Sequence, residues 1–292
     1  MKTFALVLLW GLAAGLAVTR SARAQHSVSL PEQHKLVITP AYVYQTFDRV
    51  WAGKQNVKLD GALWQHTALV SFDYGLTENT AFDAAVGWVW SETDAPALGA
   101  GSRNLKDNGL TDTTVGIRKR FIDETDFNVW WLPSLAARVG GIIEGTYDEN
   151  FPFSAGDGAS GAEASLLAGK TLCSYSGVYG DVGYRYRDGG VPDDWFGSAG
   201  AYLSWKFVSL STAYRFTQGL SGNDIGDAKF VQRITSGRPA YPMVKEISQS
   251  VEVALGITDH GRRFYQVFYA RTLDGRNTGR RDIFGGAVSL TF

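Results

Sequence analysis

The sequence predicts an all-β protein, a transmembrane antiparallel up-and-down β-barrel of about twelve strands with no plug domain. Apolar residues recur at every second position in many segments, the connections between these segments alternate in length, and the chain starts like a secreted protein. The last segment shows the pattern well. Its apolar residues are separated by small or polar ones, and they are Phe284, Val288, Leu290 and Phe292.

The first 24 residues read as a cleaved secretory signal peptide. Lys2 supplies a positive charge, residues 4–18 are almost all apolar, and Ala22-Arg23-Ala24 is an A-x-A cleavage site. The run is shorter than the roughly 20 apolar residues that a spanning helix needs. We therefore expect residues 25–292 to form the mature barrel and to reach the outer membrane of a Gram-negative cell.

Composition narrows the class further. The net charge of −1 excludes a strongly basic nucleic-acid binder, and the single cysteine, Cys173, excludes an intramolecular disulfide. Aromatic residues make up 13% of the chain, which also contains 34 glycines. This composition suits many strands with tight turns and belts of aromatic side chains at the membrane surfaces.

Alternation defines twelve expected strands, at 36–47, 63–74, 80–92, 110–121, 127–142, 162–172, 178–187, 195–207, 208–217, 247–257, 264–272 and 283–292. Short turns fall at 75–79, 122–126, 174–177, 207–208 and 258–262. Longer polar stretches fall at 48–62, 91–108, 144–161, 188–194, 219–246 and 274–281. Outer-membrane barrels have short periplasmic turns and longer extracellular loops, so both termini should lie on the periplasmic side. Residues 219–246 either fold into the lumen as a constriction or form an exposed loop.

The parity of each strand separates a lipid face from a lumen face. An arginine on the lipid face near the midplane costs about 2–4 kcal/mol, so charged parities should face the lumen. The predicted lumen-lining residues are Asp83, Asp112, Arg118, Arg120, Arg138, Asp181, Arg185, Arg187, Arg215 and Glu252, joined on the same parity by Asp73 and Glu163. Many of these charges should pair across strands, and a surplus of arginine should modestly favour anionic solutes. The segment 264–272 has aromatic residues on both parities, so the sequence does not decide which of its faces points to the lumen.

Outward aromatic residues fall into two expected belts. The inner belt consists of Phe72, Tyr74, Phe82, Phe121, Phe127, Trp205 and Phe292, and the outer belt of Trp64, Trp88, Trp90, Tyr184, Tyr186, Tyr214 and Phe216. Phe292 has a second expected role. An aromatic residue at the end of the last strand resembles the signal that the barrel-assembly machinery reads in outer-membrane proteins.

One segment carries a family resemblance. Residues 109–121, Gly-Leu-Thr-Asp-Thr-Thr-Val-Gly-Ile-Arg-Lys-Arg-Phe, resemble a strand motif of outer-membrane barrels that are named for an association with meta-pathway phenol degradation. Residues 133–138, Pro-Ser-Leu-Ala-Ala-Arg, resemble the strand that follows in that family. The resemblance implies a channel or transporter for small, often aromatic, compounds. It implies no catalytic residues.

Other functions remain open. A lipid-modifying barrel enzyme would need a serine two residues after a lipid-facing histidine, and His66 is followed at that spacing by Ala68. No nucleophile–histidine pair or metal-ligand spacing is visible, so we predict no enzyme activity, no cofactor and no metal. A structural or adhesion barrel is the other alternative. The expected partners are outer-membrane lipid, the assembly machinery and a small-molecule solute, with no nucleic acid.

Overall fold

The computed structural model describes residues 28–95, 106–127, 129–259 and 263–292. The predicted signal peptide and its cleavage site lie outside these residues, as does most of the turn that contains His260.

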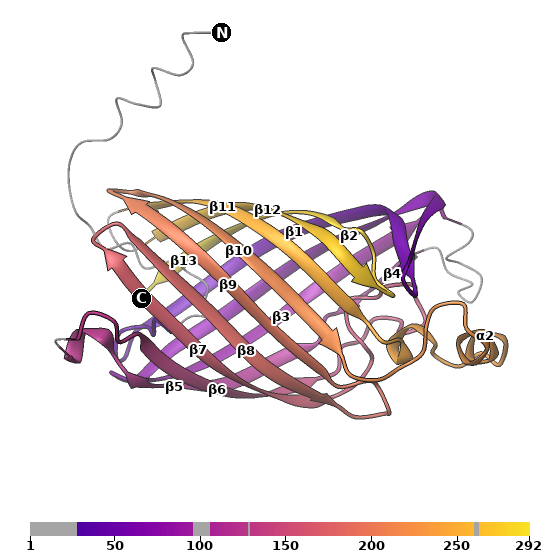
Figure 1. The fold of residues 1–292 in the computed structure, drawn as a ribbon, viewed down its shortest axis with the longest axis horizontal. Coiled ribbons are helices and arrows are strands. Elements are labelled where there is room, and N and C mark those ends of the chain that lie inside the picture. The colour runs from indigo at the N-terminus through magenta and orange to yellow at the C-terminus, as the bar shows by residue number, and fades with distance from the viewer. Residues whose placement is uncertain (1–27, 96–105, 128, 260–262) are drawn as a thin grey trace, which may run out of the picture.

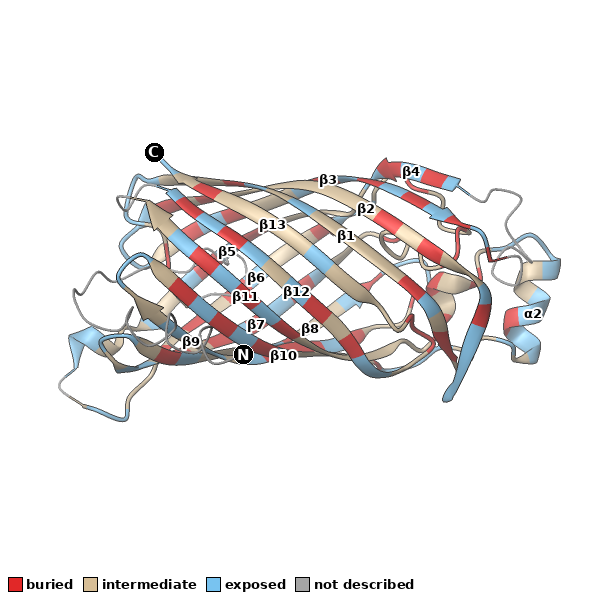
Figure 2. Cartoon of the chain, turned by 90° about the horizontal axis from the view of Figure 1, so that it is seen from above, coloured by how far each residue is buried: buried red, intermediate tan, exposed pale blue. Residues whose placement is uncertain are grey.

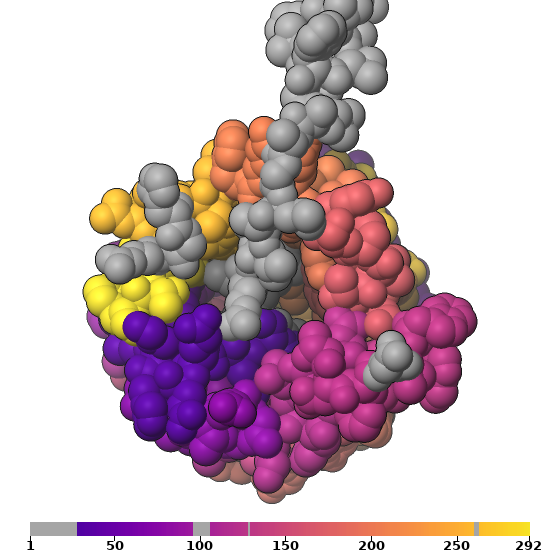
Figure 3. Space-filling model, turned by 90° about the vertical axis from the view of Figure 1, so that its left-hand side faces the viewer, coloured from indigo at the N-terminus to yellow at the C-terminus, as the bar shows by residue number. Residues whose placement is uncertain are grey.

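The described strands form one closed antiparallel barrel with twelve positions around its wall. The strands are β1 (Leu36–Ala52), β2 (Gln55–Thr77), β3 (Thr80–Thr93), β4 (Lys106–Leu110), β5 (Thr113–Ile122), β6 (Ser134–Ile143), β7 (Gly161–Cys173), β8 (Ser176–Arg187), β9 (Asp194–Trp205), β10 (Val208–Gly219), β11 (Ile247–Asp259), β12 (Arg263–Arg276) and β13 (Asp282–Thr291). Each strand pairs with the next, except that β4 and β5 both pair with β3, and β1 pairs with both β2 and β13, which closes the cylinder (Figure 1). Viewed along the barrel, the yellow C-terminal strand lies beside the indigo N-terminal strands (Figure 3).

β4 and β5 together occupy one position, because both pair with β3. The expected strand 110–121 is thus interrupted at residues 111 and 112. The backbone N–H of Thr111 still donates to Gly87 of β3, at 2.9 Å, so the wall stays continuous through the break. Asp112 is released from the ladder and turns toward the loops that cover the barrel.

The two parities of each strand have different exposures, as Figure 2 shows by alternating red and blue bands. On β3 the large side chains of Phe82, Val86, Trp88 and Trp90 are exposed, whereas Asp83 and Val89 are fully buried. A barrel wall with an apolar outer face and a polar, buried inner face is the arrangement found in barrels that lie in lipid. On β3 the apolar parity thus lies on the outer face of the barrel and the parity that carries Asp83 on the inner face. In the described part of the chain, no helix is long and apolar enough to cross a membrane.

Two expected boundaries were wrong. The expected loop 48–62 is mostly strand, because β1 and β2 continue as a long hairpin to a tight turn at Gly53, whose φ of 57° suits glycine. The expected strand 127–142 begins only at Ser134. The side chain of Asp123 caps a 3-10 turn, Glu124–Asp126, and Pro133 cannot donate to a sheet ladder, so Phe127 lies in this turn.

The end of the barrel that carries the C-terminus is crossed by residues 28–35. A Cβ atom at Gly169 of β7 would meet the side chain of Val28, and the backbone N–H of His34 donates to Gly75 of β2 at 2.7 Å. Leu30 lies between these contacts and is buried. No folded plug domain is present among the described residues. This short segment narrows the inner end instead.

The opposite end is capped by loops that pack on one another. The loop 144–160, which joins β6 to β7, crosses to the other side of the barrel and buries Phe151 completely against Phe47 and Leu63 of β1 and β2. Phe153 then contacts Tyr241 in the loop 220–246. That loop contains helix α2 (Ala228–Thr235) and a 3-10 turn, Tyr241–Met243, and α2 projects from the outer end (Figure 1).

Candidate functional site

The candidate site is a row of charged residues that slants across the inner face of the wall. The strand registers place one lumen residue of each successive strand side by side. From β2 to β9 these residues are Asp73, Asp83, Gly116, Gly140, Glu163, Arg185 and Asp194. Because the strands tilt, the row climbs from the inner end at Asp73 toward the outer loops at Asp194.

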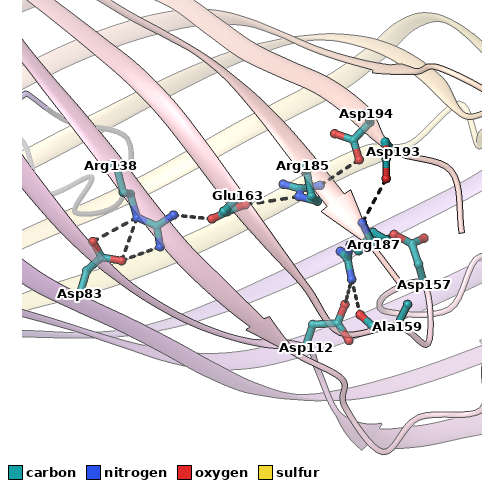
Figure 4. Close-up of polar contacts among 10 residues, drawn as sticks. All are labelled: Asp83, Asp112, Arg138, Asp157, Ala159, Glu163, Arg185, Arg187, Asp193 and Asp194. Atoms are coloured by element: carbon teal, nitrogen blue, oxygen red, sulfur yellow. Dashed lines mark hydrogen bonds and ion pairs between the residues drawn. The ribbon is translucent and has the colours of Figure 1, made fainter. Parts of the chain in front are cut away.

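Two arginines, which are neighbours of this row on β5 and β6, bind its carboxylates. Arg118 of β5 donates to Asp73 at 2.6 Å, and both side chains are almost fully buried. Arg138 of β6 lies beside Arg118 in the register and bridges Asp83 and Glu163. Its Nε and Nη2 donate to Oδ2 of Asp83 at 3.0 and 2.7 Å (Figure 4). Charges of opposite sign therefore alternate along this wall.

Two glycines make the bridge possible. Asp83 is on β3 and Arg138 is on β6, so the guanidinium must pass over β5. A Cβ atom at Gly116 would lie 2.7 Å from Nη2 of Arg138, and one at Gly140 would lie 3.1 Å from Nη1. The planar guanidinium thus lies flat on a strip of wall without side chains. Its five donors can then reach carboxylates on both sides.

The row continues to the outer end through two further arginines, Arg185 and Arg187 of β8. Glu163 accepts from Nε of Arg185 at 3.3 Å, and Nη1 of Arg185 lies 3.6 Å from Asp194 (Figure 4). Arg187 donates to Asp112 at 2.7 Å and lies 3.4 Å from Asp157 in the loop 144–160. These contacts tie the wall to the loop that covers it.

The remaining predicted lumen residues also face inward, but most lie apart from this row. Arg120 pairs with Asp123 at the inner end, at 2.9 Å. Asp181 accepts a hydrogen bond from Ser198. Arg215 and Glu252 form a separate pair at 3.2 Å, on β10 and β11. The structure therefore joins Asp83, Asp112, Arg138, Arg185 and Arg187 into neighbouring networks and leaves these four residues outside them.

The charges of the lumen are largely paired with one another. Each predicted lumen arginine lies beside at least one carboxylate. Arg185 and Arg187 additionally meet Asp194 and Asp157, which lie in the polar stretches 188–194 and 144–161 of the sequence. The register of the tilted strands decides which carboxylate each arginine meets. These contacts give no support to an anion preference.

The wall formed by β10–β13 and β1 is lined differently, mostly by side chains that are small or apolar, with one ion pair between Arg215 and Glu252. Its lumen-facing residues include Ala213, Ala254, Phe264, Phe268, Ala270, Ala287, Val37 and Ala41. On β12, Tyr265, Val267 and Tyr269 are exposed while Phe264 and Gln266 are buried, which settles the lumen face of the segment 264–272.

Aromatic side chains of the lumen lie against the wall rather than across the opening. Tyr179 of β8 pairs with Gly200 of β9, where a Cβ atom would lie 2.6 Å from the ring. Tyr202 covers Gly177 in the same way, and Phe268 of β12 covers Gly285 of β13. Glycine opposite an aromatic residue therefore keeps large side chains flat and leaves width in the lumen.

Sequence reasoning missed the loop that covers the outer end. It considered only residues 219–246 as a constriction, whereas the loop 144–160 crosses the opening through Phe151. An apolar Phe-Pro-Phe triplet at 151–153 inside a polar loop was the available signal. Part of the loop 219–246 also turns inward, because Pro242, Val244 and Glu246 line a cavity beneath the cap.

Phe292 ends beside the first strand. Its backbone N–H donates to Leu36 at 2.9 Å, and its side chain is 63% exposed on the lipid parity. Within the described ranges, no cluster of three or more histidine, cysteine or acidic residues is arranged to hold a metal ion.

No protein-family model matches the chain, and no curated protein sequence matches it. Among solved structures, an outer membrane channel from Pseudomonas putida F1 matches with a TM-score of 0.71 and 14% identity, over 94% of this chain and all of that chain. The translocator domain of the autotransporter NalP from Neisseria meningitidis matches with a TM-score of 0.48 and 15% identity, over 90% of this chain and 89% of that one. The toluene transporter TodX from Pseudomonas putida matches at 0.41 and 12%, over 90% of each chain. The first of these matches shows that the chain has the fold of an outer-membrane channel.

Proposed function

We propose that this protein is an outer-membrane channel that lets small, weakly polar organic solutes of about the size of a single aromatic ring cross the membrane. The observation that carries the proposal is the division of the lumen into two walls. On one wall the charges are largely paired with one another, and on the other most side chains are small or apolar, apart from the Arg215–Glu252 pair.

Paired charges affect a passing solute less than free ones. A guanidinium that already binds two carboxylates has little attraction left for a solute anion, and the field of alternating charges falls off quickly with distance. The opposite wall offers apolar contacts, and its aromatic rings lie flat on glycines. Such a lumen favours a solute that has an apolar body and little net charge.

Both ends of the barrel are narrowed, which supports a selective channel over an open pore. Residues 28–35 cross the inner end, and the loop 144–160 crosses the outer end. A twelve-stranded barrel is already narrower than the 16–18-stranded porins. The resemblance of residues 109–121 to barrels associated with phenol degradation agrees with small aromatic solutes.

The experiment is permeation with three solutes of similar size. Purified protein in liposomes should admit benzyl alcohol faster than protein-free liposomes do, and should admit glucose and benzoate much more slowly. Stopped-flow light scattering would measure the rates. Equal rates for all three solutes would show an unselective pore, and no protein-dependent rate for any of them would overturn the channel proposal.

A further inference from the structure

The aromatic side chains that face the lumen from β8, β9 and β12 share one feature: each ring lies over a glycine of a neighbouring strand. A Cβ atom on any of these glycines would lie closer than 3.0 Å to the ring. The pairs of ring and glycine are Tyr179–Gly200, Phe196–Gly183, Tyr202–Gly177, Phe264–Gly256 and Phe268–Gly285. Glycine allows the closest approach of a ring to the wall, since any side chain in its place would hold the ring farther into the lumen.

Two of these rings belong to one row of lumen residues that crosses the wall from β8 to β1. The strand registers place its members side by side, in the order Gly177, Tyr202, Ser211, Ala254, Phe268, Gly285 and Val43. Tyr202 leans toward β8, over Gly177, whereas Phe268 leans toward β13, over Gly285. The two rings therefore turn away from each other, and two small side chains separate them in the row.

Tyr202 and Phe268 remain open to the lumen. Both residues are partly exposed, although they lie on the inner parity of their strands. Phe196 and Phe264, which also lie over glycines, are by contrast only 7% and 6% exposed and are therefore covered by other side chains. A solute that moves along this wall touches Tyr202 and Phe268, so the height of these two rings above the wall limits the size of the solute.

The contact between Phe268 and Gly285 shows how a glycine controls this height. The three atoms nearest to a Cβ atom at Gly285 all belong to the Phe268 ring, so this ring alone occupies the space of a side chain there. On the other side of Phe268 in the row lies Ala254, which already carries a methyl group. With alanine at position 285, the ring would meet a methyl group on both sides and would have to stand farther into the lumen.

We propose that Phe268 and Tyr202 determine the size of the solutes that the channel admits, because the glycines beneath their rings set how far the rings reach into the lumen. The faces of two aromatic rings suit a flat, weakly polar solute. The inference rests on the proposed channel function and names two residues that select among its solutes. The competing explanation is that each ring only covers the backbone of its glycine and supports the sheet, without any effect on the width of the lumen.

Single-channel recording of the full-length protein in planar bilayers, with ethylene glycol oligomers of graded length in the bath, tests this inference without an aromatic solute. An oligomer that fits into the lumen lowers the ion conductance, so the longest oligomer that does so gives the width. Gly285→Ala should shift this limit to shorter oligomers, because its methyl group displaces the Phe268 ring. Gly286→Ala is the matched control, since its Cβ atom would meet nothing closer than 3.5 Å.

Removal of the rings should have the opposite effect. Phe268→Ala and Tyr202→Ala should each shift the limit to longer oligomers. Gly285→Ala should have no further effect in the Phe268→Ala background, since no ring is left to displace. Tyr265→Ala controls for the loss of an aromatic residue from β12, because Tyr265 is exposed on the lipid face. Heat-modifiable migration in gels would show that each variant is folded.

The outcomes separate this inference from the proposed function. If folded Gly285→Ala keeps the wild-type limit, if it narrows the lumen equally without the Phe268 ring, or if Phe268→Ala and Tyr202→Ala both keep that limit, the rings do not set the width and the inference is wrong. Those results leave the permeation of benzyl alcohol into liposomes untouched. Size limits that shift as expected, in a protein that admits no benzyl alcohol, would instead support the role of the rings and contradict the proposed solutes. A wild-type protein that conducts no ions would contradict both.

Discussion

Arg138 on β6 binds the carboxylate of Asp83 on β3 across the intervening strand β5, with its Nε and Nη2 donating to Oδ2 at 3.0 and 2.7 Å. The contact is possible because Gly116 and Gly140 leave the wall bare beneath the guanidinium. One side chain thus links four neighbouring strands, since Arg138 also pairs with Glu163 of β7.

Gly116→Ala should destabilise the barrel by about 1–3 kcal/mol, because the added methyl group would lie 2.7 Å from a buried guanidinium that four hydrogen bonds to the carboxylates of Asp83 and Glu163 hold in place. Gly141→Ala is the matched control, since the nearest atom to its Cβ is 3.8 Å away. The measurement is urea unfolding of the barrel in detergent, followed by tryptophan fluorescence. Equal stability of the two variants would mean that Arg138 can leave its position at little cost.

Arg138→Met should cost about 3–5 kcal/mol, because it leaves Asp83 and Glu163 buried without their shared cation. Arg215→Met should cost much less. The side chain of Arg215 is 34% exposed and pairs with Glu252 alone among the ion pairs described. The same unfolding assay compares the two. Similar losses for both variants would contradict a special structural role for the Arg138 bridge.

Phe151→Ala should raise single-channel conductance in planar bilayers. Phe151 is fully buried against Phe47 and Leu63, and removing such a ring costs about 3–5 kcal/mol of packing, enough to release the loop that crosses the outer end. Leu220→Ala serves as the control, because Leu220 is 46% exposed and lies outside this cluster. Unchanged conductance in folded Phe151→Ala would show that this loop does not limit ion flow.

Deletion of Phe292 should reduce the amount of folded, heat-modifiable barrel in outer-membrane fractions. The residue pairs with Leu36 and so closes β13 against β1, and it presents an exposed ring at the end of the last strand. Phe292→Tyr keeps an aromatic ring and should assemble normally. A normal yield for the deletion would mean that neither the ring nor the final backbone pair is needed for assembly.

Glu124→Gln should destabilise the turn between β5 and β6 at neutral pH but not in acid. Burial alone would raise the pKa of Glu124, but hydrogen bonds from Lys170 and Thr171 lower it below its usual value. A carboxyl whose folded pKa is depressed adds stability above its unfolded pKa, and this stability is lost as the pH falls through the folded pKa. Unfolding temperatures of the two proteins should therefore converge between neutral pH and about pH 3. A difference in unfolding temperature that stays the same over this pH range would contradict the explanation.

The sequence by itself determined which residues belong to the barrel wall and which face of each strand meets lipid. In a strand, every second side chain points to the same face, and the face that meets lipid must be free of charged residues. Asp83, Arg118 and Arg185 could therefore be assigned to the lumen without knowing which residues they contact. The lengths of the connections likewise predicted which end of the barrel carries the short turns and which carries the long loops. The number of about twelve strands followed from counting the alternating segments.

Tertiary structure alone decided what those lumen residues contact. The partner of Arg138 depends on the stagger of four strands, which no local pattern in 134–143 reveals. The burial of Phe151 and Asp194 was likewise decided by tertiary structure, because both lie in stretches that the sequence predicts as loops. Loops have no periodicity, and their burial depends on which distant strands lie across the opening. Closure of the barrel brings those strands within reach, and closure is a property of the whole chain.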